Sequence, residues 1–241
     1  MHIRLHPALA FVATWVVFLL GMGVATGIRR LAGLESEFLS GLCFKFVLAA
    51  LALLLMLLDR RRLSAFGFCR SHSTWPDWLI GLGLGGLFGA IGSAAIIVSP
   101  GKGMTFLQQQ AFWQIVVGVW IVSSISEEIL VRGLAQSWMT GGSGLRLGRV
   151  RLSTAVLASG LLFGSMHLMI LRAGVDAWTV CIVVAFTTSL GLVAAHYREK
   201  SGSLLLPIVI HAAGNVGGMV GGVITAILTM ILTGSPPNVA G

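Results

Sequence analysis

The sequence predicts an all-α, polytopic membrane protein: one integral domain over residues 1–241, folded as a bundle of about seven or eight transmembrane helices. Of the 241 residues, 56% are hydrophobic and only 10% are charged, whereas a soluble domain usually carries about 25% charged residues. The apolar residues also occur in runs of roughly 18 or more, the length that a helix needs to cross a bilayer. These observations exclude an ordinary soluble domain.

Seven apolar segments are expected to cross the membrane, and most of them end at charged or glycine-rich residues. Their approximate bounds are 8–28, 38–58, 78–98, 111–139, 153–171, 177–195 and a seventh from about 204 onwards. The first is interpreted as a retained span, because its apolar core is longer than the roughly 7–15 residues of a signal peptide. A last helix, at about 222–232, is either an eighth crossing or a continuation of the seventh.

The formal net charge of +8 comes from basic residues that lie mostly in the short loops between apolar runs. With the N-terminus in the cytoplasm, most loop lysines and arginines fall on the cytoplasmic side, as the positive-inside rule requires. We therefore expect a multi-pass protein of the inner or plasma membrane with a cytoplasmic N-terminus. The expected partners are the lipid bilayer and a membrane-embedded or membrane-anchored substrate, and no nucleic acid.

Glycine is abundant, with 32 residues, although it weakens an isolated helix. In membranes, small residues at one face of a helix let another backbone approach closely. Two stripes have the required spacing of four residues: Gly81, Gly85 and Gly89 in the third segment, and Gly214, Gly218 and Gly222 near the end of the chain. These stripes predict tight helix packing rather than catalysis.

Two adjacent acidic residues, Glu127 and Glu128, interrupt the fourth apolar segment. Charged groups inside a span are costly and usually mark function. Neighbours on a helix point about 100° apart, whereas Glu128 and Arg132, four residues apart, share a face. We expect Arg132 to neutralise Glu128 and to leave Glu127 unpaired. In the alternative interpretation, both acids belong to a polar cluster that only locks the bundle.

Three further polar residues lie deep in later segments: His167 in the fifth, and His211 and Asn215, four residues apart, in the seventh. A single histidine in an apolar helix more often makes an interhelical hydrogen bond than performs catalysis. Buried polar groups need partners, however, and one shared cluster with Glu127 is the least costly arrangement. Lys45, in the second segment, is interpreted as a snorkelling or packing residue.

Such a cluster suits hydrolysis. A glutamate in an apolar site is a usable base near neutral pH, and a histidine can help to polarise a water molecule. A second histidine and an asparagine amide can donate hydrogen bonds to an oxyanion. The sequence contains no His-Glu-x-x-His, no Gly-x-Ser-x-Gly and no intramembrane aspartate pair. Its three widely spaced cysteines support neither a disulfide framework nor a metal knuckle.

Three motifs in order resemble the CAAX-protease and bacteriocin-processing family of intramembrane glutamic endopeptidases, which includes the type II CAAX prenyl endopeptidases. They are Glu127-Glu-Ile-Leu-Val-Arg132, Phe163-Gly-Ser-Met-His167 and His211-Ala-Ala-Gly-Asn215. The resemblance covers roughly residues 123 to 215, within a catalytic-motif core of about 111–220. It implies a helical bundle of about eight spans with an active site inside the membrane, open toward the cytoplasm.

The resemblance also implies roles for the site residues. Glu127 and His167 would activate a water molecule, His211 and Asn215 would hold the oxyanion, and Glu128 and Arg132 would support the site. It implies a metal-free reaction with no cofactor. Nothing in the sequence selects a prenylated substrate.

Three other interpretations stay open. In the first, a zinc ion is bound by His167, His211 and Glu127. In the second, the chain is a non-catalytic immunity or scaffold protein. In the third, it is a small transporter, although no internal repeat of the kind that transporters carry is visible. Any catalytic interpretation requires Glu127 and His167 to lie at the same depth. Either Glu127 sits in the middle of a long fourth helix, which we favour, or the fifth segment begins later than predicted.

Overall fold

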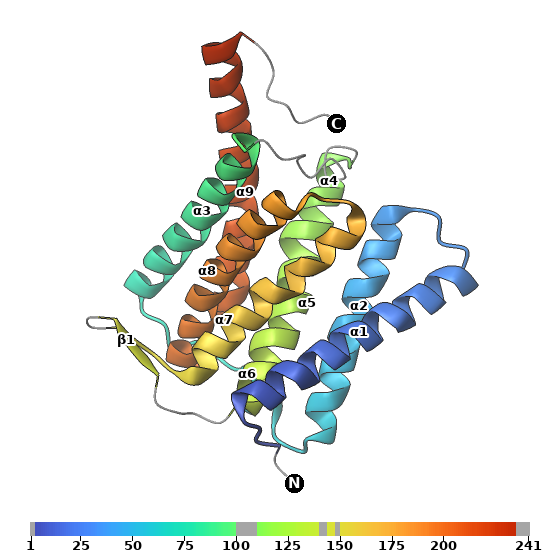
Figure 1. Cartoon of the computed structure of the whole chain (residues 1–241). Helices are drawn as coiled ribbons and strands as arrows, with labels where there is room; N and C mark the ends of the chain where they lie inside the picture. Colours follow the sequence, from blue (N-terminus) through green and yellow to red (C-terminus); the bar gives the residue numbers. More distant parts are fainter. Residues whose placement is uncertain (1–2, 100–109, 140–143, 148–149, 235–241) are drawn as a thin grey trace.

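The computed structural model describes residues 3–99, 110–139, 144–147 and 150–234, and its architecture is an all-helical bundle with one short hairpin (Figure 1). Within these residues, seven helices are long and apolar enough to span a membrane. Their outward faces carry large apolar side chains, such as Leu20, Trp75 and Ile231, which are more than half exposed. The predicted integral multi-pass fold is confirmed.

The membrane-spanning helices follow one another along the chain. They are α1 (Pro7–Leu31), α2 (Glu37–Leu58), α3 (Trp75–Ile97), the composite helix Phe112–Trp138, α7 (Thr154–Met166) with its extension η5 (His167–Ala173), α8 (Ala177–Ser201) and α9 (Leu205–Thr233). The short elements are the 3₁₀ turn η1 (Leu63–Phe66) and an antiparallel hairpin of β1 (Leu145–Leu147) and β2 (Val150–Leu152).

The C-terminal helix decides whether the described residues contain seven or eight membrane-spanning helices. The segment predicted at 222–232 is no separate crossing, because α9 continues without a break to Thr233. The sixth segment is longer than predicted: α8 runs through its charged end to Ser201 and stops at Gly202, whose φ of 70° is left-handed and favours glycine.

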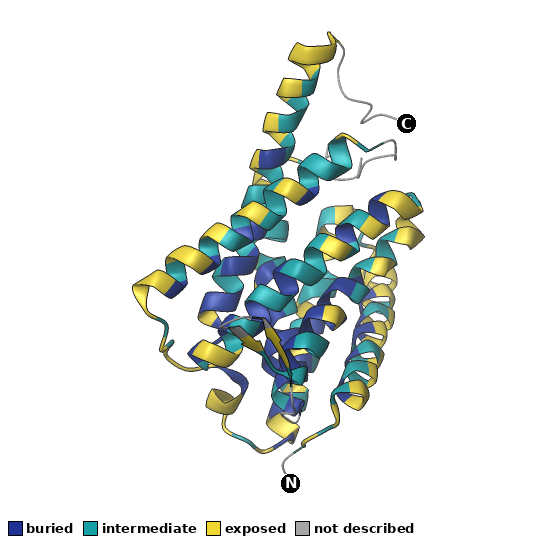
Figure 2. Ribbon diagram, turned by 60° about the vertical axis from the view of Figure 1, so that its left-hand side comes forward, coloured by how far each residue is buried: buried dark blue, intermediate teal, exposed yellow. Residues whose placement is uncertain are grey.

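The composite helix Phe112–Trp138 passes through the middle of the bundle (Figure 1). It consists of α4 (Phe112–Gln114), the π-helix η3 (Ile115–Ser123), α5 (Ser124–Glu128), a second π-helix η4 (Ile129–Ala135) and α6 (Gln136–Trp138). A π-helix has a wider turn than an α-helix, and π-helical turns occur frequently at functional sites. Both wide turns flank α5, the single segment that carries the two adjacent glutamates. Figure 2 shows buried residues concentrated in this part of the bundle and exposed residues on the outward faces.

The glycine stripes bring α3 and α9 into backbone contact, as predicted. A Cβ atom added to Gly85 would lie 2.5 Å from the carbonyl oxygen of Ile210, and one on Gly89 would lie 1.9 Å from that of Gly214. Only glycine allows this approach. Gly222 is the exception, since a Cβ there would make ordinary contacts.

A buried carboxylate, Asp59, joins the N-terminal segment and the end of α2 to the end of the composite helix. Its oxygens accept hydrogen bonds from the guanidinium of Arg61 (2.7 and 3.1 Å), the backbone N–H of Ile3 (3.2 Å) and the indole of Trp138 (2.9 Å). Burial by itself raises the pKa of Asp59, but the hydrogen bonds from Arg61, Ile3 and Trp138, with the charge of Arg61, outweigh it. The net pKa is below the ordinary 3.8.

Candidate active site

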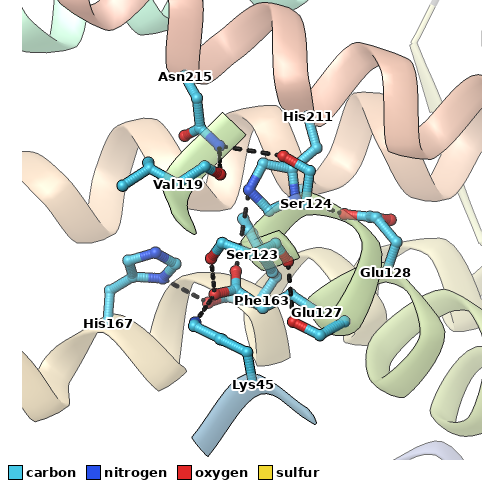
Figure 3. A network of polar contacts seen from close by, with 12 residues as sticks. Lys45, Val119, Ser123, Ser124, Glu127, Glu128, Phe163, His167, His211 and Asn215 are labelled. Carbon is cyan, nitrogen blue, oxygen red and sulfur yellow. Dashed lines mark hydrogen bonds and ion pairs between the residues drawn. The ribbon is translucent and has the colours of Figure 1, made fainter. Parts of the chain in front are cut away.

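The polar residues predicted to form one site come together around α5 (Figure 3). Glu127 and Glu128 project from α5, His167 from the start of η5, and His211 and Asn215 from one face of α9. Glu127 and His167 lie at a similar depth in the bundle, as the catalytic interpretation requires. Glu127 is eleven residues from the Trp138 end of its helix and His167 is thirteen residues from the Thr154 start of α7. At about 1.5 Å per residue, these positions lie roughly 17 and 20 Å from the same end of the bundle.

Glu128 and Arg132 form the predicted ion pair, and both side chains are completely buried. Nη1 of Arg132 donates to Oε1 of Glu128 at 2.6 Å. Its Nη2 donates to the carbonyl oxygen of Gly191 in α8 at 2.9 Å, and its guanidinium lies 4.5 Å from the centre of the Phe163 ring. The pair therefore connects three helices behind the site.

Glu127 is not unpaired, and the interpretation of Lys45 as a snorkelling or packing residue is wrong. The ammonium of Lys45, from α2, pairs with Oε1 of Glu127, and the hydroxyl of Ser123 donates to the same oxygen at 2.7 Å. The missed signal was present in the sequence. Lys45 and Glu127 are both ionisable groups within spans, and each needs a counter-charge.

His211 links the two glutamates. Its Nδ1 lies 3.0 Å from Oε1 of Glu128, and its Nε2 lies 3.8 Å from Oε2 of Glu127. Because an ionised carboxylate only accepts hydrogen bonds, Nδ1 of His211 carries the hydrogen. Glu128 therefore orients the imidazole, and the Nε2 edge of the ring faces Glu127.

His167 is oriented by its own helix. Its Nδ1 lies 2.9 Å from the carbonyl oxygen of Phe163, one turn earlier. A carbonyl oxygen can only accept, so Nδ1 carries the hydrogen and the lone pair is on Nε2. The ring of Phe163 packs edge-on between both histidines, with its centre 5.1 Å from that of His167 and 5.0 Å from that of His211.

Asn215 ties α9 to the composite helix through two hydrogen bonds. Its amide nitrogen donates to the carbonyl oxygen of Val119 at 3.0 Å and to the hydroxyl of Ser124 at 3.1 Å. Both amide hydrogens thus have partners within the protein. Val119 lies in the π-helix η3, where the carbonyl–amide pairing differs from that of an α-helix. Ser123 and Ser124 were not among the predicted site residues, although the run of serines beside the glutamates was a visible signal.

The zinc alternative would need His167, His211 and Glu127 to converge on one ion. Within the described residues, no three His, Cys, Asp or Glu side chains lie close enough together to hold a metal ion. In addition, the ammonium of Lys45 already neutralises the carboxylate that zinc would need. The donors present are those of a hydrogen-bonded network around one partly exposed carboxylate.

The geometry defines a helical membrane protein with a glutamate–histidine site in its interior, and the comparison with known families agrees. Residues 109–217 match the type II CAAX prenyl endopeptidase Rce1-like family model, which agrees with the resemblance of the three motifs to the CAAX-protease family. The segment contains the three motifs but neither α2 nor Lys45. No curated protein and no solved structure gives a significant match.

Proposed function

We propose that this protein is an intramembrane endopeptidase that hydrolyses a peptide bond of a membrane-associated protein or peptide. One observation carries the proposal: a glutamate carboxylate in the middle of the membrane-spanning bundle turns one oxygen toward the free edge of a histidine, 3.8 Å away. Oε2 of Glu127 and Nε2 of His211 therefore face one space, in which the attacking water, beside Glu127, and the oxyanion that forms, beside His211, can both lie.

In the proposed reaction, Glu127 is the general base and His167 helps to orient and polarise the water. The water oxygen attacks the carbonyl carbon, and one water proton passes to Glu127. The tetrahedral oxyanion is held by His211 and by the amide of Asn215. For this, His211 must carry a hydrogen on Nε2 as well as on Nδ1, and Asn215 exchanges one of its two present hydrogen bonds. The proton on Glu127 then passes to the leaving nitrogen and the C–N bond breaks, which gives a carboxylic acid and an amine. The acid proton passes to the amine, so the products are a carboxylate and an ammonium group.

Partial exposure of the site supports an enzyme rather than a scaffold. A cluster kept only for packing would be dry and closed, like the pair behind it. The side chain of Glu127 is 12% exposed and that of Lys45 is 22% exposed, whereas Glu128 and Arg132 have no exposure. The reacting carboxylate is therefore the accessible one of the two.

The decisive variant is Glu127→Gln, which keeps the shape of the side chain and removes the base. Purified wild-type and variant proteins would be reconstituted in liposomes with two internally quenched peptides that end in Cys-a-a-X, one farnesylated and one not. Cleavage of either by wild type, and by at least 100-fold less in the variant, supports the proposal. A Glu127→Gln protein that cleaves at the wild-type rate disproves it.

A comparison of membrane proteomes from cells with the active protein and with Glu127→Gln would identify natural substrates as uncut proteins that accumulate. Metal analysis of the purified active protein tests the zinc alternative independently. A stoichiometric metal that is removed together with activity would establish zinc and overturn the metal-free reaction.

We also propose that the N-terminus lies in the cytoplasm and that the protein resides in the inner or plasma membrane. In Figure 1, the N-terminus, the connection between α2 and α3 and the β1–β2 hairpin lie at one end of the bundle. This end carries many loop arginines, such as Arg60, Arg62 and Arg151. Cys69 is exposed in the same region, so a membrane-impermeant maleimide should label it only from the cytoplasmic side.

A further inference from the structure

Lys45 of α2 is the charged residue of the site that neither the motifs nor the family match includes. We infer that Lys45 is a positioning residue for the hydrolysis: it holds Oε1 of Glu127 so that Oε2 faces the attacking water, and it keeps Glu127 ionised. This inference rests on the proposed function and extends the site to a helix outside the matched segment.

The two carboxylate oxygens of Glu127 have different partners. Oε1 accepts from the ammonium of Lys45 and from the hydroxyl of Ser123, at 2.7 Å. These two donors come from different helices, so they fix both the position and the rotation of the carboxylate. Oε2 remains directed toward Nε2 of His211, at 3.8 Å. A general base must be held within hydrogen-bonding reach of the proton that it takes, and this pair of donors does so.

Lys45 also balances the negative charge of Glu127. Around Glu127, Lys45 faces it from α2, His211 from α9 and His167 from η5, while Glu128 and Arg132 lie on its own helix. Arg132 is bonded to Glu128. Among the described residues, Lys45 therefore supplies the ammonium or guanidinium group that is bonded to Glu127. A carboxylate that loses such a partner in a largely buried site binds a proton more readily and no longer acts as a base at moderately acidic pH.

The Lys45–Glu127 pair is also partly exposed. The side chain of Lys45 is 22% exposed and that of Glu127 is 12% exposed. A charged pair sealed completely inside the bundle would be costly and would have no route to water. The Lys45–Glu127 pair is the more accessible of the two ion pairs in the cluster, because Glu128 and Arg132 have no exposure.

The test compares Lys45→Met, Lys45→Arg and Ser123→Ala with Phe46→Leu, a neighbouring α2 residue that is exposed on the outer face. The measurement is kcat/KM from pH 5 to pH 9 with the peptide that the wild-type protein cleaves. In Lys45→Met, the acidic midpoint of the profile should move upward by at least one pH unit, so that activity relative to wild type falls most at the acidic end of the range and recovers toward pH 9. KM should change little.

The other variants separate charge from geometry. Lys45→Arg keeps the charge, so its acidic midpoint should stay in place. Ser123→Ala keeps both charges and removes one donor, so kcat should fall several-fold, with no comparable shift in the profile. Phe46→Leu should match wild type. Folding of each protein is checked by size-exclusion chromatography and thermal unfolding. If Lys45→Met does not fold, Ser123→Ala still tests whether the donors to Oε1 of Glu127 position the carboxylate.

Three results would overturn the inference: a wild-type profile in Lys45→Met, a loss in Lys45→Met that is equal at every pH, or an acidic midpoint that moves upward in Lys45→Arg. The proposed function fails separately, through an active Glu127→Gln protein. If Glu127→Gln is inactive while Lys45→Met keeps the wild-type profile, the peptidase stands and only the role of Lys45 is wrong.

Discussion

Replacing Arg132 by Met should destabilise the folded protein strongly, because it would leave the carboxylate of Glu128 buried without its counter-charge. Arg132 donates to Glu128 at 2.6 Å and to the carbonyl of Gly191 at 2.9 Å, and neither charged side chain of the pair is exposed. Breaking one side of a buried pair costs about 3–5 kcal/mol. For a chain of this size, that corresponds to a fall in Tm on the order of 10 °C.

The double variant Arg132→Met/Glu128→Gln tests the cause. With both charges removed, no charge is left uncompensated, so most of the lost stability should return, and the glutamine oxygen can still accept from His211. Thermal unfolding in detergent is measured by circular dichroism, with Arg70→Met, at an exposed loop position, as the control. The reasoning is refuted if Arg132→Met is as stable as wild type, or if the double variant is no more stable than the single one.

Three further predictions concern packing, pH and catalysis. Gly89→Ala should push α3 away from Gly214 and cost about 1–3 kcal/mol in thermal unfolding, whereas Gly83→Ala, with open space around it, should cost nothing. Because the pKa of Asp59 is lowered by folding, its stabilising contribution is complete above about pH 4 and is lost as the pH falls through the lower native value. Asp59→Asn should therefore show a flatter dependence of Tm on pH in the acidic range. His167→Gln should reduce kcat by about 100-fold or more with an unchanged Tm, and a fall in Tm that matches the loss of activity would contradict its catalytic role.

The sequence by itself determined the class of fold and the local part of the site. Long apolar runs specify membrane helices regardless of tertiary detail, because a helix satisfies its own backbone hydrogen bonds in lipid. The glycine stripes and the Glu128–Arg132 pair follow from the spacing of four residues, which places side chains on one helical face. Each of these relations lies within one helix or one face, so it can be read from residue spacing alone.

Only the tertiary structure decided which groups from different helices meet. Lys45 and Glu127 are 82 residues apart, and their pairing depends on how α2 packs against the wide turns on either side of α5. The same packing directs one oxygen of Glu127 to Lys45 and the other to His211, and it engages Asn215 with Val119. Spacing along the chain does not specify such contacts, because a buried charge takes whichever partner the assembled helices bring within reach.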